Sequence, residues 1–208
     1  MAGAQRFERK QAVSDHKRAL ILDAARKVFE QEGLDGASLR AIAAEAGYTP
    51  AALYFHFDSK EAIYAEVLRV SIARLQEEVE RAVAKTRSPA EKLRAAAMAF
   101  FDFYTENPRD LDLGFYLFRG GMKPHGLGKE RDKQLNAALA SALQSISDAA
   151  EELGAKREDA RMLTVDTFAH AAGLLLLAHT HRIRMFGASA RDLMEQYVED
   201  RIARMRGR

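Results

Sequence analysis

The side chains of this sequence that could do acid–base chemistry are scattered, and one pair is spaced to act together. Asp166 and His170 stand four residues apart in an apolar helical pattern, so they would share one face of a helix. With Ser141 or Ser145 they could form a hydrolase-like triad. However, the sequence has no Gly-x-Ser-x-Gly motif and no phosphate-binding glycine loop. We therefore predict that the protein is not an enzyme.

The residue types that bind metals show no arrangement suited to an ion. The sequence has no cysteine, which excludes disulfides, thiol nucleophiles and cysteine metal sites. His179 and His181 are two residues apart and would point to nearly opposite sides of a helix. We predict no metal and no other cofactor.

Polar and aromatic side chains of a different kind gather between residues 38 and 60, in two short helical patterns. The first begins at Ser38 and repeats an apolar residue every three or four positions: Leu39, Ile42, Ala43 and Ala46. Gly47 ends it, because glycine adopts the left-handed conformation without steric cost. Thr49 and Pro50 are then an N-cap and a first-turn proline of a second, short helix. Two helices joined in this way predict a helix-turn-helix, whose second helix enters the DNA major groove.

The residues of this segment resemble one protein family. The run Leu53-Tyr54-Phe55-His56-Phe57, followed by Lys60, is similar to the recognition-helix signature of the tetracycline-repressor (TetR) family of bacterial transcriptional regulators. Residues 21–39 resemble that family's first helix and the turn into its second. The resemblance covers roughly residues 14–64, and beyond them only length and helical layout are similar. It implies an all-α protein with an N-terminal three-helix DNA-binding head and a C-terminal helical ligand-binding and dimerisation domain.

The resemblance also implies which residues contact DNA. Arg40 would meet a phosphate or a base edge, and Lys60 a phosphate. Tyr54 and His56 would touch the sugar–phosphate backbone. The positions that would face the bases are Tyr48, Thr49, Pro50, Ala51 and Ala52. The family usually has a smaller aliphatic residue where Tyr48 stands, and the two alanines lack hydrogen-bonding groups, so no operator sequence follows from them.

The two phenylalanines of the recognition-helix signature have a simpler interpretation. Phe57 is expected in the hydrophobic core, and Phe55 is expected to be about half buried.

Length and composition fit a helical protein of one large or two small domains. The chain has 208 residues, of which 48% are hydrophobic and 30% charged, and its net charge of +2 is a weak argument for nucleic acid. Basic residues nonetheless gather near the N-terminus: Arg6, Arg9, Lys10, Lys17 and Arg18. Such an arm can lie along DNA, although solvated disorder is the default. We predict a flexible basic arm at residues 1–13 within a DNA-binding domain of residues 1–60. Residues 61–208 would form the effector-binding and dimerisation domain.

No segment predicts export or membrane insertion. The N-terminus lacks the apolar run of a signal peptide. The most apolar segment, residues 169–178, is interrupted by His170 and is shorter than the ~20 residues that a spanning helix needs. We expect a buried helix and a cytoplasmic protein.

Helix signals continue through the rest of the chain. Capping-box spacing occurs at residues 58–61 and 88–91, and Asn107-Pro108 opens another helix in a similar way. Further helices are expected at about 130–153, 157–186 and 189–206. The glycine-rich residues 120–128 predict a loop or a mobile lid, and no strand pattern is present.

Aromatic residues cluster in the predicted C-terminal domain: Phe100, Phe103, Tyr104, Phe115, Tyr116 and Phe118. Such a cluster is more often core than pocket, but the resemblance implies a small-molecule cavity beside these helices. Bulky aromatic side chains favour an apolar or aromatic effector. Asp166, His170 and Leu174 complete the predicted site. Asp166 and His170 could equally form a hydrogen-bonded pair at a dimer interface.

The helix expected after residue 157 is apolar around most of its circumference, so it must be covered on two sides. The resemblance implies that this helix and the last one form a four-helix dimer interface. The residues that would form it are Phe168, Ala172, Leu175, Leu176, Ile183, Met194, Tyr197, Val198 and Ile202. A monomer with a thick core is the alternative.

These patterns together predict a ligand-responsive homodimeric transcriptional regulator. It would most simply be a repressor that binds a palindromic operator and is released by a small apolar or aromatic molecule. One alternative is a DNA-binding regulator without an effector, and another is a helical binding module whose helix-turn-helix is vestigial. The effector, the operator and the regulated genes do not follow from the sequence.

Overall fold

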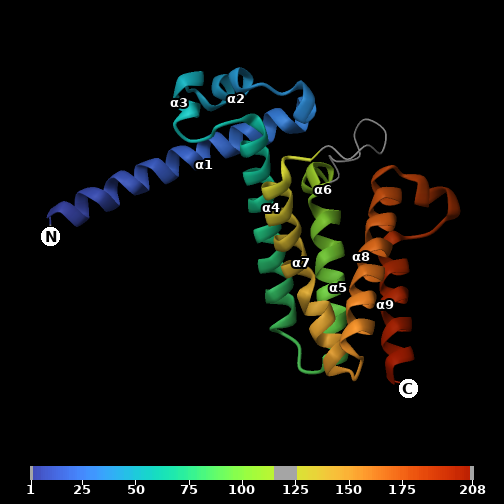
Figure 1. Cartoon of the computed structure of the whole chain (residues 1–208). Helices are drawn as coiled ribbons and strands as arrows, with labels where there is room; N and C mark the ends of the chain where they lie inside the picture. The colour runs from blue at the N-terminus through green and yellow to red at the C-terminus, as the bar shows by residue number, and fades with distance from the viewer. Residues whose placement is uncertain (1, 115–125, 207–208) are drawn as a thin grey trace. The chain divides into compact units, whose positions relative to one another are not determined.

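The computed structural model describes residues 2–114 and 126–206, and every regular element within them is a helix, which confirms the all-α prediction (Figure 1). The chain forms two compact units. The first comprises residues 1–70 and 112–135, and the second comprises residues 71–111 and 136–208. The predicted boundary at residue 60 is the first residue of α4 (Lys60–Val83), whose residues up to Val70 belong to the first unit.

The first unit begins with a long helix, followed by two short ones: α1 (Ala2–Gly36), α2 (Leu39–Ala46) and α3 (Pro50–Tyr54). Residues 2–13, which lie in the predicted flexible arm, are helical, because α1 already begins at Ala2. Residues 5–20 are mainly Ala, Gln, Lys, Arg and other residues that helices tolerate, and they include no proline or glycine. Nothing in this stretch therefore breaks the helix.

Local capping interactions fix both ends of α2 and the start of α3 as the sequence predicts. The Ser38 hydroxyl accepts a hydrogen bond from the Ala41 amide at 3.1 Å, and Gly47 ends α2 in the left-handed region with φ 70°. The Thr49 hydroxyl accepts from the Ala52 amide at 3.3 Å. These caps satisfy amide groups that a helix start leaves unpaired, and so they set where α3 begins.

The core of the first unit lies beneath the two short helices. Ile42, Leu53 and Ile63 are fully buried, and burying an aliphatic side chain of this size contributes roughly 1.5–3 kcal/mol. The rings of Phe29 and Tyr64 meet edge to face at 4.8 Å. Each of α1 to α4 thus supplies a buried side chain to one cluster, which holds α3 against α1 and the start of α4.

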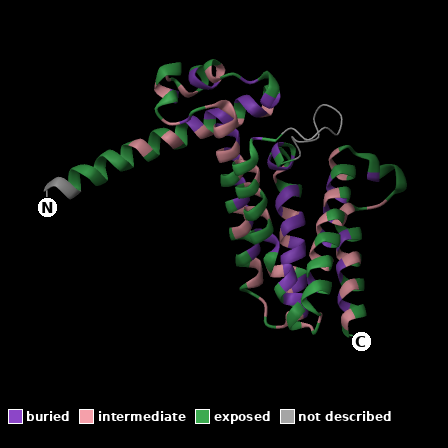
Figure 2. Ribbon diagram, in the orientation of Figure 1, coloured by how far each residue is buried: buried purple, intermediate pink, exposed green. Residues whose placement is uncertain are grey.

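The second unit is built from the rest of α4 and the later helices. These are α5 (Pro89–Glu106), α6 (Pro108–Gly114, shared with the first unit), α7 (Lys129–Glu152, also shared), α8 (Arg157–His179), the 3-10 helix η2 (Arg182–Phe186) and α9 (Ala190–Arg206). Figure 2 shows that buried residues are most continuous along α5. The predicted capping box of Ser88 and Glu91 is present at the start of α5.

Two features predicted for the second half of the chain differ from the structure or lie partly outside the described residues. The helix expected at residues 157–186 ends at His179, because His181 adopts a left-handed conformation with φ 57° before η2 begins. Of the glycine-rich residues 120–128, those up to 125 lie outside the described residues, and Gly126 to Gly128 are not helical.

Helix α8 is the one helix of the described residues that is long and apolar enough, by length and composition alone, to cross a membrane. A core helix of a globular protein meets the same criteria. Only 22% of its most apolar stretch is buried within the protein. The expectation of a buried helix therefore holds for one side of α8 and not for the other.

Candidate nucleic-acid interface

Most of the predicted DNA-contacting residues lie on α3 or next to it in the chain. Thr49, Pro50, Ala51 and Tyr54 are exposed, while Tyr48, Ala52 and His56 are partly buried, and Arg40 is exposed on α2. Leu53 behind them is fully buried. One side of α3 is thus anchored in the core, and the other side presents small and aromatic groups to solvent.

Phe55 extends this exposed surface further than predicted. Its side chain is 89% exposed, whereas Phe57 is buried as expected. The expectation that Phe55 would be half buried is therefore corrected. The sequence spacing could have indicated this exposure. Leu53 and Phe57 are four residues apart on the buried face, so Phe55, midway between them, points away from that face.

Arg18 of α1 secures the end of α3. Its guanidinium lies 4.3 Å from the centroid of the Phe57 ring and donates a hydrogen bond to the His56 carbonyl at 3.3 Å. It also pairs with Glu66 of α4 at 3.5 Å. Hydrogen bonds from Arg69, together with the charge of Arg18, hold the pKa of Glu66 below its ordinary value. The sequence grouped Arg18 with the basic arm, and its position beside α3 depends on the tertiary fold.

Lys60, for which a phosphate contact is predicted, has acceptors within the protein. Its ammonium donates to the carbonyl oxygens of Leu34 at 2.8 Å, Ala37 at 3.2 Å and Asp35 at 3.3 Å. Regular helix geometry is interrupted just before them at Gly33, with φ 70°, so these carbonyls need other donors. Any phosphate would compete with three carbonyl oxygens for this ammonium group.

The aromatic residues of the second unit pack on one another. Phe100, Phe103 and Tyr104 are all buried, with ring centroids 5.1 Å apart for both Phe100–Tyr104 and Phe103–Tyr104. Phe168 of α8 joins them, 5.8 Å from Phe100, so this residue predicted at the dimer interface packs inside the protomer. Burial raises the pKa of Tyr104, so its hydroxyl stays protonated. Phe115, Tyr116 and Phe118 lie outside the described residues.

Asp166 and His170 connect α8 to α9 within one protomer. The His170 ring stacks on the Tyr197 ring at 4.1 Å, and the Tyr197 hydroxyl donates to Asp166 at 2.8 Å. Arg201 also pairs with Asp166, at 3.1 Å. Nε2 of His170 is buried without a hydrogen-bond partner among the described residues. Burial lowers the pKa of His170, which favours its neutral form.

Most side chains predicted at the dimer interface fill the protomer's own core, which corrects that assignment. Leu175, Ile183, Met194, Val198 and Ile202 are at most 7% exposed, Ala172 and Tyr197 are partly buried, and Leu174 of the predicted ligand site is buried as well. Helices α5, α8 and α9 pack against one another here. Sequence periodicity identified the apolar faces of α8 and α9 but not the elements that cover them.

Another side of α8 carries the exposed apolar residues. The side chains of Met162, Val165 and Leu176 are 62%, 58% and 56% exposed, and Leu177 is 38% exposed. Ala169 and Gly173 are exposed between them. The spacing of Met162, Val165, Ala169 and Leu176 by three, four and seven residues places them on one face. We call Met162, Val165, Ala169, Gly173 and Leu176 the α8 stripe. Leu176 is the one predicted interface residue within it.

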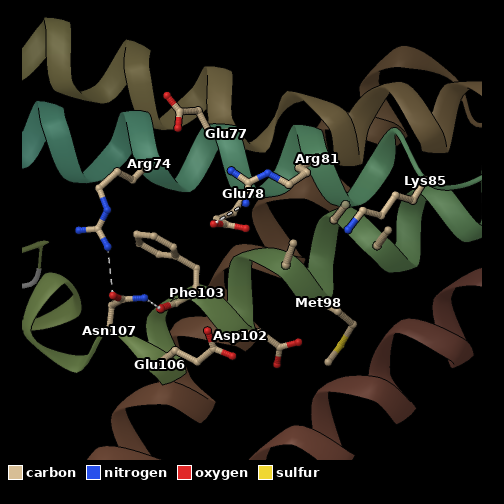
Figure 3. A pocket seen from close by; sticks show the side chains of 13 residues that line it. Arg74, Glu77, Glu78, Arg81, Lys85, Met98, Asp102, Phe103, Glu106 and Asn107 are labelled. Atoms are coloured by element: carbon tan, nitrogen blue, oxygen red, sulfur yellow. Dashed lines mark hydrogen bonds and ion pairs between the residues drawn. The ribbon is translucent and has the colours of Figure 1, made fainter.

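A groove of about 510 Å³ runs between α4 and α5 (Figure 3). Its apolar lining includes Met98 and Phe103, and the Arg74 guanidinium lies 5.6 Å from the Phe103 ring centroid while donating to Asn107 at 3.2 Å. Around these lie the charged residues Glu77, Glu78, Arg81, Lys85, Asp102 and Glu106. Phe103 is the one predicted ligand-site residue that lines this groove.

A second groove, of about 490 Å³, lies between α8 and α9. Its lining includes Met162, Leu163 and Met205, with Asp166 and Arg201 among the charged residues. Among the residues that the structure describes, no group of three or more His, Asp or Glu side chains is placed to hold a metal ion.

Sequence comparison finds a matching family and several relatives. Residues 21–67 match the family described as "Bacterial regulatory proteins, tetR family". The transcriptional activator FasR of Mycolicibacterium smegmatis is 37% identical over 101 residues, which are 49% of this chain and 46% of FasR. The uncharacterised regulator YdgC of Bacillus subtilis is 27% identical over 152 residues, covering 71% of this chain and 72% of YdgC. The chain thus matches less than half the length of FasR, and 40% of the regulator UidR of Escherichia coli.

Solved structures share the fold over most of the chain. A crystal structure from Pseudomonas aeruginosa PAO1 has a TM-score of 0.74 at 21% identity, covering 93% of this chain and 92% of that one. The regulator FadR of Bacillus subtilis, in complex with stearoyl-CoA, has a TM-score of 0.68 at 18% identity, covering 87% of this chain and 95% of FadR. At these identities the likeness concerns the fold.

Proposed function

Because the chain belongs to the TetR family of bacterial regulatory proteins, we propose that it is a cytoplasmic DNA-binding transcriptional regulator. One observation carries this proposal: α3 is anchored from behind by buried Leu53, while its other side exposes small and aromatic groups. A surface of this kind fits a major groove, because alanine side chains permit close approach to base edges and thymine methyl groups.

Individual residues have distinct roles in this proposal. Arg40 contacts a base edge or a phosphate, and Ala51 and Ala52 approach the bases, together with Tyr48, Thr49 and Pro50. Tyr54 and His56 contact the sugar–phosphate backbone, and exposed Phe55 adds an apolar contact beside them. Phosphate contacts set the position of the protein, and base contacts set its sequence preference.

A second copy of the chain is the proposed partner of the α8 stripe. The stripe leaves several large apolar side chains in solvent on one helix face, and exposed apolar patches commonly mark interaction sites. A twofold dimer would cover the stripe with the same stripe of the other copy. It would also present two α3 helices to a palindromic operator.

The second unit is the proposed site of effector control. FadR of Bacillus subtilis, which shares the fold, was solved with stearoyl-CoA. The groove between α4 and α5 is the proposed binding site for a small apolar or aromatic molecule, because Met98 and Phe103 give part of its lining an apolar character beside the charged side chains. If the effector and the operator favour different arrangements of the dimer, each weakens the other by the same coupling free energy, typically ~1–3 kcal/mol. The protein would then be a repressor released by its effector. A regulator that lacks an effector is the alternative.

Selection of binding sequences from a random duplex library with the purified protein tests DNA recognition. We expect enrichment of a palindrome, and a footprint centred on it. Arg40→Ala should relax the preference at specific base pairs by on the order of 1–3 kcal/mol if it reaches a base edge. Phe55→Ala should weaken binding without lowering stability, because its side chain is exposed. Absence of any enriched sequence, together with weak binding whose affinity depends little on salt, would favour a vestigial helix-turn-helix.

A further inference from the structure

The N-terminal half of α1 is an exposed helix within the first unit. Among residues 5–20, Ser14 and Arg18 are partly buried and the others are exposed. Figure 1 shows this part of α1 extending beyond α2 and α3. Because the protein does not cover this helix, its own sequence or a binding partner must account for the exposed surface.

Charge is segregated around this helix. Arg6, Lys10 and Lys17 are spaced by four and seven residues and therefore lie on one face. Glu8 and Asp15 are spaced by seven residues and lie on the opposite face, about 180–200° around the helix axis from Arg6 at 3.6 residues per turn. We call Arg6, Lys10 and Lys17 the basic face of α1.

The basic face points to the same side of α1 as the helix-turn-helix. Continuing from Lys17, the same line along α1 passes through Ile21, Ala24 and Val28, at steps of four, three and four residues. These three side chains are buried in the head, where α1 packs on α2. The side of α1 that faces the head thus becomes basic where α1 extends beyond it.

We propose that residues 5–20 of α1 form a rigid basic arm that contacts DNA phosphates flanking the half-site read by α3. This inference rests on the proposed function, and it adds a second contact region to it. Phosphates are the partner that fits three cations on one face with the acids turned away. Sixteen helical residues extend about 24 Å at 1.5 Å per residue, so the arm can reach roughly seven base pairs along a duplex at 3.4 Å each.

The test compares two duplexes that carry the selected operator, one trimmed at the operator ends and one extended by ten base pairs on each side. Binding of the wild-type protein should depend more steeply on salt with the extended duplex, by about 0.9 in the logarithmic slope for each added phosphate contact. In the triple variant Arg6→Gln/Lys10→Gln/Lys17→Gln this difference between the duplexes should disappear. The matched control Glu8→Gln/Asp15→Asn changes charge on the opposite face, and should keep the difference.

Ala12→Pro tests whether the arm must be a helix. It keeps every charge but interrupts the exposed helix, because proline removes an amide donor and clashes with the preceding turn. We expect it to abolish the difference between the duplexes, with binding to the trimmed duplex showing that the head is folded. Retention of the full difference in Ala12→Pro would overturn the rigid arm.

Other outcomes separate failure of this inference from failure of the proposed function. Equal salt slopes of the wild-type protein on both duplexes, with operator binding intact, would overturn the arm alone. Binding to phosphatidylserine vesicles that only the triple variant loses, combined with equal slopes, would assign the basic face to a lipid surface instead. Absence of sequence-specific binding to either duplex would instead overturn the proposed function.

Discussion

At the scale of single residues, Lys60 is predicted to contact a DNA phosphate, but in the structure its side chain bonds to the protein itself. Its ammonium reaches three carbonyl oxygens at the end of α1. Lys60→Ala should therefore lower the free energy of unfolding by about 1–3 kcal/mol, because the partly buried carbonyl oxygens of Leu34 and Ala37 lose a charged donor. Urea denaturation measures this, and Lys133→Ala, which removes an exposed lysine of α7, is the control. Unchanged stability with a DNA salt slope lowered by about one would assign Lys60 to phosphate instead.

His170 makes stability depend on pH. Its pKa is lowered by burial, so the unfolded chain binds the proton more readily than the folded protein does. Asp166 acts against this shift, and Arg201 strengthens it. Stability is therefore full above the ordinary pKa of about 6.5 and falls as the pH drops toward the lowered value. Unfolding midpoints at pH 8 and pH 5.5 should differ less in His170→Gln than in the wild type. Equal differences in both proteins would mean that His170 is not responsible.

At the scale of helices, α8 and α9 show that an apolar face can either be buried within the protomer or remain exposed for a partner. Leu176 lies in the exposed α8 stripe, which is the proposed dimer interface. Leu176→Glu should give folded monomers, because its carboxylate would be left without a partner in that packed interface. Val198→Glu is buried within the protomer and should unfold the second unit instead. Sedimentation velocity and circular dichroism distinguish the two effects. Ala140→Glu on the exposed side of α7 is the control, and dimers of unchanged stability in Leu176→Glu would place the interface elsewhere.

At the scale of the whole molecule, effector binding and DNA binding should oppose each other. A small apolar or aromatic molecule that binds only the folded protein stabilises it by about 2.7 kcal/mol at 100 times its Kd. We expect such a compound, in a thermal-shift screen, also to release the operator. Phe103→Ala should reduce that release, and its own stability must be measured because emptying a core site costs about 3–5 kcal/mol. A broad panel that gives neither a thermal shift nor DNA release would favour the effector-free regulator.

The local geometry of the head follows from the sequence because its signals act over a few residues. The hydroxyl caps at Ser38 and Thr49, the left-handed Gly47 and the proline at position 50 each fix one helix end through a contact with a near neighbour in the chain. Hydrophobic periodicity likewise identified most of the helices of the second unit. The family resemblance of residues 14–64 depends on the same local pattern.

Only the tertiary structure decided which neighbour each side chain meets. Periodicity shows that a helix face is apolar, but burial of that face depends on helices distant in the sequence, which is why Met194 and Val198 lie in the core while Met162 remains exposed. Polar partners are long-range in the same way: Lys60 meets carbonyls of residues 34–37, and Tyr197 meets Asp166. Contacts of this kind form when chain segments are brought together by packing, so no short pattern encodes them.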